Sequence, residues 1–211
     1  TSHAQWNEGA NDGFVSAHYD RHGAQAAPHV MGYFDRSTLS TLHALADSGS
    51  LCDRWFCSLL SSTWPNRFYF LAGENGGSFG NSFPEGGATF SSIFDRLESA
   101  GIPWANYYGN VPFSVLLPGR RIVDPQYIPL EHFFADAQAG HLPAFTLIDP
   151  IFGRNDDHPP AHPIAGQILL ASIYEALASS PHWERSLLLI TYDEHGGFFD
   201  HVSPPTAADA R

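Results

Sequence analysis

The sequence has no lysine, only two cysteines and no long apolar run. All ten of its basic residues are arginines, against 22 Asp and Glu, so the formal net charge of the 211 residues is −12. Such an acidic chain argues against binding to nucleic acid or to an anionic membrane, because both need clustered basic side chains. No apolar run reaches the roughly 20 residues of a membrane-spanning helix. A phosphate-binding site would also need a metal ion or local His and Arg side chains to reverse the local charge.

The two cysteines, Cys52 and Cys57, fit no zinc signature, since no second Cys or His pair lies at a matching offset. Two free thiols and one local disulfide both remain open. The chain begins with Thr1 and has neither the basic nor the apolar region of a signal peptide, so we expect a trimmed or internal piece. Hydrophobic residues make up 43% of it, enough for a packed core, and we expect residues 1–211 to form one domain.

The most informative stretch is residues 187–201. Four large aliphatic residues, 187–190, predict a fully buried strand of a parallel sheet. They are followed by Asp193, Glu194 and His195, then by a Gly-Gly pair. Because ligands bind at the carboxyl ends of strands in open α/β sheets, these side chains predict a site for a cation or a proton. A solvated acidic turn is the alternative, which a second Asp-His pair at Asp200 and His201 makes the weaker one.

Helical and strand patterns alternate along the rest of the chain, which predicts an α/β fold with a largely parallel sheet flanked by helices. Residues 1–35 and the Gly-rich residues 73–89 are expected to be irregular. Amphipathic helices are expected at 38–47, 90–100, 129–138 and 164–178, and short strands at 50–60, 102–108 and 142–150.

Thr63 lies where a helix is expected to begin, in an N-cap-like position with Pro65 in the first turn. A hydroxyl at a helix N-terminus faces free backbone N–H groups, which form a ready site for a phosphate. The local sequence by itself favours the simpler alternative, a structural cap.

Two further motifs have different weight. His158 and His162 lie in a proline-stiffened loop, 155–163, that would aim their side chains at little entropic cost. Ser78 formally matches the G-x-S-x-G pattern of serine esterases, but that pattern needs a strand before it and a helix directly after it. The match is interpreted as chance, with a serine esterase as a weak alternative.

The run from Thr191 to Val202, Thr-Tyr-Asp-Glu-His-Gly-Gly-Phe-Phe-Asp-His-Val, resembles a hallmark of the bacterial phosphoesterase family, which comprises non-specific (phosphatidylcholine-type) phospholipases C and related acid phosphatases. Further blocks agree with the family in order along almost the whole chain. These blocks are residues 6–15, 43–47, 52–58, 63–67 and 157–160, with Gly166 and Gln167.

The resemblance implies a metal-dependent hydrolase with an alkaline-phosphatase-like α/β core, of which this chain would be a partial domain. Thr63 corresponds to the family's nucleophile and also to a metal ligand. Asp193 and Glu194 correspond to its carboxylate metal ligands, and His158 to an active-site histidine. The implied mechanism is in-line attack by Thr63 on phosphorus, a phospho-threonine intermediate, and then attack by water.

The residue chemistry agrees with these implied roles. A threonine hydroxyl is a poor nucleophile until a metal or a base takes its proton. Adjacent carboxylates are hard oxygen ligands that suit a divalent cation, whose identity the sequence leaves open. A histidine near neutral pKa could protonate the departing alkoxide. Asn66, His195 and His201 are candidate substrate-binding residues.

One family feature is absent. The family's motif set begins with a Glu-Asn-Arg-Ser-Phe-Asp-type block whose Glu and Asn also bind the metal, and this chain contains no such block; its one Glu-Asn pair, Glu74 and Asn75, lies in the Gly-rich loop. We therefore expect either a fragment or an incomplete site. The alternatives to a phospholipase C are an acid phosphatase acting on phosphomonoesters and a catalytically incomplete metal- or phosphate-binding fragment.

The expected partner is a small-molecule or lipid phosphoester, with no nucleic acid and no transmembrane segment, and the oligomeric state is open. Family resemblance predicts export to the periplasm or the outside of the cell.

Overall fold

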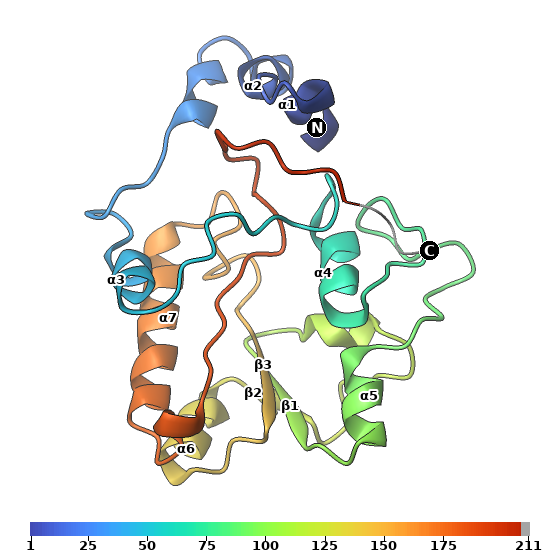
Figure 1. The fold of residues 1–211 in the computed structure, drawn as a ribbon, viewed down its shortest axis with the longest axis vertical. Coiled ribbons are helices and arrows are strands. Elements are labelled where there is room, and N and C mark those ends of the chain that lie inside the picture. Colours follow the sequence, from blue (N-terminus) through green and yellow to red (C-terminus); the bar gives the residue numbers. More distant parts are fainter. Residues whose placement is uncertain (208–211) are drawn as a thin grey trace.

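The fold is built around a small parallel sheet, which the computed structural model shows with helices on both faces (Figure 1). The structure describes residues 1–207. The strands are β1 (Trp104–Tyr108), β2 (Tyr127–Pro129) and β3 (Phe145–Asp149), in the order β2-β1-β3. Both pairings are parallel, and Tyr108 lies between Pro129 and Asp149. The predicted α/β class with a parallel sheet is confirmed.

Side chains of the central strand β1 alternate between two hydrophobic cores. Trp104 packs in one core with Phe68 of α4 (Thr63–Ala72) and Phe94 of α5 (Ile93–Ser99). Tyr107 packs in the other with residues of α6 (Glu131–Ala139) and α7 (Pro163–Ala178). Because β1 is covered on both faces, it is buried at nearly every position, as expected of a central parallel strand.

The helices that the periodicity predicts are present, including α3 (Ser40–Ser48). α5 begins with a reciprocal capping box, in which Ser92 and Asp95 satisfy each other's backbone and side-chain groups. Short 3₁₀ helices at Phe113–Leu116 and Trp183–Arg185 complete the middle of the chain. Within residues 1–207, every helix is too short or too polar to span a bilayer.

The prediction that residues 1–35 are irregular is wrong. They form α1 (Ser2–Trp6) and α2 (Phe14–His22), with 3₁₀ helices at Asn7–Gly9 and Ala27–Met31. The Asn and Gly residues that suggested a loop lie at the junctions, where Asn7 and Asn11 adopt positive φ angles. Local composition thus marked the breaks between the helices and concealed the helices themselves.

The predicted strand at 50–60 is also wrong. This segment forms no strand, and Leu51 and Trp55 are exposed. The side chain of Asn66 bonds both the N–H and the C=O of Leu59 and the C=O of Ser61. A side chain therefore satisfies backbone groups here that a partner strand would otherwise satisfy.

The buried strand predicted at 187–190 is the third correction. Residues 187–190 form no strand, and Leu187 and Leu189 are 90% and 60% exposed. Leu188, between them, packs against the core on the α6 and α7 face. In Figure 1 this segment belongs to the orange-red chain that rises from the 3₁₀ helix Trp183–Arg185 toward the N-terminal helices. It lacks a hydrogen-bonded neighbour among residues 1–207, so its aliphatic side chains alternate between core and solvent without forming a ladder.

Candidate functional site

Thr63 is the first residue of α4, and Ser62 takes the N-cap position in extended conformation. Thr63 is half-buried, and in the described part of the chain its hydroxyl makes no hydrogen bond, so it does not act as a side-chain cap. The helix end offers few donors, because Trp64 N–H already donates to Asn81 (2.9 Å) and Pro65 has no N–H. The hydroxyl is available for chemistry, while the anion-binding capacity of this helix N-terminus is reduced.

Asn66 is buried and supports the backbone that leads into Thr63. Its Nδ2 group donates to the carbonyls of Leu59, Ser61 and Ser62, and its Oδ1 accepts from Leu59 N–H. With all its hydrogen-bonding groups used in this way, Asn66 shapes the loop before the helix. Substrate binding by Asn66 stays a prediction.

Arg67 connects three parts of the site, and the sequence analysis did not identify it. Its Nε donates to Asp193 Oδ2 and its Nη1 to Asp149 Oδ1, both at 2.8 Å. Its guanidinium carbon lies 5.2 Å from the ring centre of Phe113 and 5.0 Å from that of Phe152. Burial by itself would lower the pKa of Arg67, but the charges of Asp149 and Asp193 outweigh it and raise that pKa.

Asp193 and Glu194 lie side by side but bind different partners. Asp193 pairs with Arg67, whereas Glu194 Oε2 accepts from Gly196 N–H at 2.8 Å and lies 3.4 Å from His195 Nδ1. Burial alone would raise the pKa of Glu194, but the hydrogen bond from His195, the Gly196 N–H and the nearby His158 charge hold this pKa below its usual value. The Glu194 carboxylate is thus kept ionised.

The N-terminal helices hold the loop that follows Glu194. Gln5 is buried; its Oε1 lies 2.9 Å from His195 Nε2, and its Nε2 donates to the Gly197 carbonyl at 3.3 Å. Phe14 packs edge-on against His195 and Phe199. Figure 1 shows these helices, in blue, beside the red segment. Residues almost 200 positions apart in the sequence therefore position His195 together.

His158 and His201 are both exposed. His158 Nδ1 lies 2.7 Å from the carbonyl of Pro159, and His158 is near enough to Glu194 to contribute to the lowered pKa of that carboxyl. Asp157, just before it, accepts from Tyr192 O–H at 2.8 Å. His201 Nδ1 lies 3.9 Å from Asp200 Oδ1, and within residues 1–207 the structure does not bring His201 to the other predicted residues.

A glycine makes the Asp157 anchor possible. A Cβ atom at Gly166, in the first turns of α7, would lie 2.1 Å from Asp157 Oδ1, so a larger residue there would displace the Asp157 carboxylate. Asp157 is itself at a positive φ of 59°. The histidine loop therefore packs against α7 and is hydrogen-bonded to Tyr192, the residue before Asp193.

A metal ion would find an incomplete set of ligands here. Nowhere in residues 1–207 do three His, Cys, Asp or Glu side chains gather closely enough to hold one. Asp193 and Glu194 are suitable hard oxygen ligands, but one Asp193 oxygen is engaged by Arg67 and one Glu194 oxygen by Gly196. These two carboxylates can supply only part of the ligand set that a divalent cation needs.

Two features found in the sequence have simpler roles. Ser78 is buried, donates to the carbonyls of Gly80 and Ser82, and has neither a strand before it nor a helix directly after it. The chance interpretation of its motif is confirmed. Cys52 and Cys57 are free thiols, which excludes the local disulfide.

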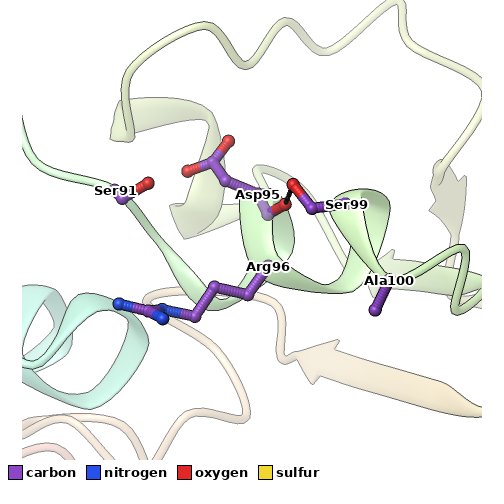
Figure 2. Close-up of a pocket in the computed structure, with 5 residues that line it drawn as sticks. All are labelled: Ser91, Asp95, Arg96, Ser99 and Ala100. Atoms are coloured by element: carbon purple, nitrogen blue, oxygen red, sulfur yellow. Dashed lines mark hydrogen bonds between the residues drawn. The ribbon is translucent and has the colours of Figure 1, made fainter.

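Two surface hollows lie away from these residues. Figure 2 shows one on α5, lined by Ser91, Asp95, Arg96, Ser99 and Ala100. Another lies at the end of the sheet near Trp104 and His141. Neither contains a predicted site residue, and a shallow hollow of polar side chains on one helix has no convergent chemistry.

Comparison with known proteins identifies the sequence blocks. The model of the phosphoesterase family matches residues 1–211. A non-specific phospholipase C1 of Arabidopsis thaliana is 36% identical over 197 residues, which cover 85% of this chain and 36% of the relative. Phospholipase C A of Mycobacterium tuberculosis (strain H37Rv) is 33% identical over 235 residues, covering 97% of this chain and 45% of the relative.

Non-specific phospholipase C6 of Arabidopsis thaliana is 37% identical over 195 residues, again covering 36% of the relative. The chain therefore spans less than half the length of these relatives. The predicted family is nevertheless confirmed over the full match: this chain belongs to the phosphoesterase family.

Proposed function

We propose that the protein hydrolyses phosphoesters in the manner of a phospholipase C, with Thr63 as the nucleophile. The observation that carries the proposal is the Thr63 hydroxyl, which is half-buried at the start of α4 and unused as a cap. One turn later on the same helix face, Arg67 binds Asp193 of the acidic loop. Membership of the phosphoesterase family and the names of the relatives, all phospholipases C, support the same activity.

The proposed reaction has two steps. Thr63 Oγ1 attacks phosphorus in line and forms a phospho-threonine, while the bond from phosphorus to the alcohol oxygen breaks. The Thr63 proton passes to the loop carboxylates, of which Asp193 Oδ1 makes no hydrogen bond in the described residues. His158 protonates the departing alkoxide. Water then attacks phosphorus, releases the phosphate product and restores Thr63.

The divalent metal stays part of the proposal, with Asp193, Glu194 and Thr63 as its ligands from this chain. When bound, a divalent cation would neutralise phosphoryl charge and favour the threonine alkoxide. The reaction needs such a positive group, because the chain is strongly acidic and the helix end offers few N–H donors. Elemental analysis of the purified protein tests it; absence of any divalent metal, with turnover insensitive to EDTA, would refute the metal.

Substitution of the nucleophile tests the main proposal. Thr63→Ala should lower turnover of a chromogenic phosphomonoester and of a phosphocholine diester on the order of 10⁴-fold, while Thr63→Ser keeps a hydroxyl and part of the activity. Thr41→Ala, on α3, is the matched control. The ratio of the two substrates distinguishes a phospholipase C from an acid phosphatase. Unchanged turnover of both by Thr63→Ala would remove Thr63 as the nucleophile.

The incomplete ligand set favours a second candidate, a metal- or phosphate-binding unit without turnover. Equilibrium binding of phosphate and of divalent metals to residues 1–211, measured beside their turnover, separates the two. Full turnover by residues 1–211 would refute this second candidate.

We also propose export, on family resemblance alone. Fractionation of cells that express the native gene tests it, and recovery of the protein only with cytoplasmic markers would contradict it.

A further inference from the structure

We propose that Arg67 is a positioning residue that fixes the acidic loop relative to the nucleophile. The inference rests on the proposed function of Thr63. Arg67 stands four residues after Thr63 on α4, so the two side chains leave the same face of one helix. Through its guanidinium, the helix that carries the nucleophile is tied to Asp193 of the loop and to Asp149 at the end of β3.

Two carboxylates and two aromatic rings surround the guanidinium of Arg67 and restrict its movement. Asp149 is 1% exposed and is itself held by Phe113 N–H at 3.0 Å and by Asn106 at 3.2 Å, so it is a fixed anchor. Phe113 and Phe152 lie against the guanidinium, whose carbon is 5.2 Å and 5.0 Å from their ring centres. The ion pair with Asp149 and these two rings together limit the movement of the Nε–H group, which holds Asp193.

The position of the Asp193 carboxylate depends on its ion pair with Arg67 more than the position of the Asp149 carboxylate does. Its side chain is 23% exposed and lies on a segment without strand pairing, and Arg67 is its one side-chain partner in the described residues. The preceding apolar run therefore does little to place the carboxylate. Arg67 supplies the rigidity that a sheet would otherwise supply at the carboxyl end of a strand.

A lysine could not do the same. Its ammonium is a compact point charge without a fork or a planar face, so it would pair with one carboxylate at a time and would not be oriented by the two rings. Arg67→Lys thus keeps the charge of the site and removes the geometry. This makes it a sharper test than removal of the charge by Arg67→Gln.

The experiment uses the protein as its own gene encodes it. Arg67→Lys should lower kcat about 10- to 100-fold and change KM less than about 3-fold, because a misplaced carboxylate affects the reaction and not the binding of substrate. Arg67→Gln should lower kcat further. Arg36→Gln is the matched control, since Arg36 pairs with Asp47 on the exposed surface, and it should leave both constants unchanged.

A double variant separates positioning from general stability. If Arg67 acts through Asp193, Arg67→Lys/Asp193→Asn should have the kcat of Asp193→Asn alone, because residues that act as a unit are not additive. Additive losses would overturn the proposal. A raised KM with unchanged kcat would also overturn it and would identify Arg67 as a direct phosphate contact.

Two further results keep the test decisive. If Arg67→Lys is unfolded by circular dichroism at the assay temperature, Phe152→Leu loosens the guanidinium and leaves Arg67 in place; it should give a smaller loss of kcat at constant KM, and an unchanged kcat would refute positioning. If Thr63→Ala keeps full turnover, the proposed function fails whatever Arg67→Lys does. If Thr63→Ala is inactive and Arg67→Lys is unaffected, the positioning role alone fails.

Discussion

The end of β3 and the segment 187–194 have the same kind of sequence, an apolar run that leads to an aspartate, yet they differ in structure. β3 pairs with β1 at five positions, and its final residue, Asp149, is buried with three side-chain or backbone partners. Residues 187–190 have no ladder in the described chain, and Asp193 is partly exposed with Arg67 as its partner. An apolar run becomes a strand only where a second strand accepts its hydrogen bonds.

Arg67 links the two regions directly, because it binds both aspartates at the same distance of 2.8 Å. One carboxylate is a structural anchor and the other belongs to the proposed chemistry. Loss of the Asp149 pair should therefore mainly lower the free energy of unfolding, whereas loss of the Asp193 pair should mainly lower turnover.

Asp149→Asn should lower the free energy of unfolding by about 3 kcal/mol, because it removes one partner of a buried ion pair and leaves Arg67 undercompensated. Urea unfolding followed by circular dichroism measures it. Asp124→Asn, which affects an exposed pair with Arg121, is the control and should change stability by less than about 0.5 kcal/mol. A loss below about 1 kcal/mol for Asp149→Asn would show that the ion pair at the end of β3 stabilises the fold no more than the ion pair in the loop does.

Tyr107→Phe, in β1, should cost about 1 kcal/mol at pH 7, since the Tyr107 hydroxyl donates to Asp136 at 2.7 Å. Burial, and then the hydrogen bond and charge of Asp136, raise the pKa of Tyr107 above its usual range. A raised pKa means that the folded state keeps a proton that the unfolded state loses. The stabilisation from this tyrosine is therefore complete below about pH 10 and falls as the pH rises beyond it.

Urea unfolding of wild type and Tyr107→Phe between pH 8 and about pH 11 measures this dependence. The variant should lose stability less steeply above about pH 10. Some alkaline loss should remain, because the pKa values of Tyr127 and Tyr192 are raised as well, mainly by burial. If the free energy of unfolding fell equally steeply with pH in both proteins, the stabilisation assigned to the Tyr107 hydroxyl would be contradicted.

The sheet and the helices that cover it could be predicted from the sequence, because their periodicity and end signals lie within each element. Periodicity placed α5, α6, α7, β1 and β3 within a few residues, and proline and glycine marked their ends. The three-residue strand β2 (Tyr127–Pro129) escaped notice, since three residues carry no periodicity. The helix start at Thr63 was also local information, although the N-cap proved to be Ser62.

The arrangement of the site could not be predicted in the same way, because its contacts join distant residues. Gln5 meets His195 across 190 positions, and Arg67 meets Asp193 across 126. Neither Gln5 nor Arg67 belongs to a pattern that announces chemistry. The sequence did carry one signal for Arg67: it is an arginine in an apolar helix of an acidic chain, and such a residue needs carboxylate partners.

Asp193→Asn should cost about 1 kcal/mol or less, because the Asp193 carboxylate is partly solvated and its ion pair with Arg67 is screened. Arg67 would keep Asp149 as a partner in this variant. Turnover should nevertheless fall on the order of 100-fold or more, in contrast to the larger stability loss at Asp149. Urea unfolding and turnover of the two variants, measured side by side, test this; equal stability losses at both positions would erase the difference between anchor and loop.

Leu187→Ala should change the free energy of unfolding by less than about 0.5 kcal/mol, because the Leu187 side chain is 90% exposed and has little apolar contact to lose. Leu188→Ala is the matched control: the same methyl groups are deleted one residue later, where the side chain packs against the core on the α6 and α7 face, and the cost should be about 1 kcal/mol. Urea unfolding of both variants decides the matter. If Leu187→Ala costs as much as Leu188→Ala, both faces of residues 187–190 are covered in solution. This segment would then be a strand like β3, and the difference between the two runs would disappear.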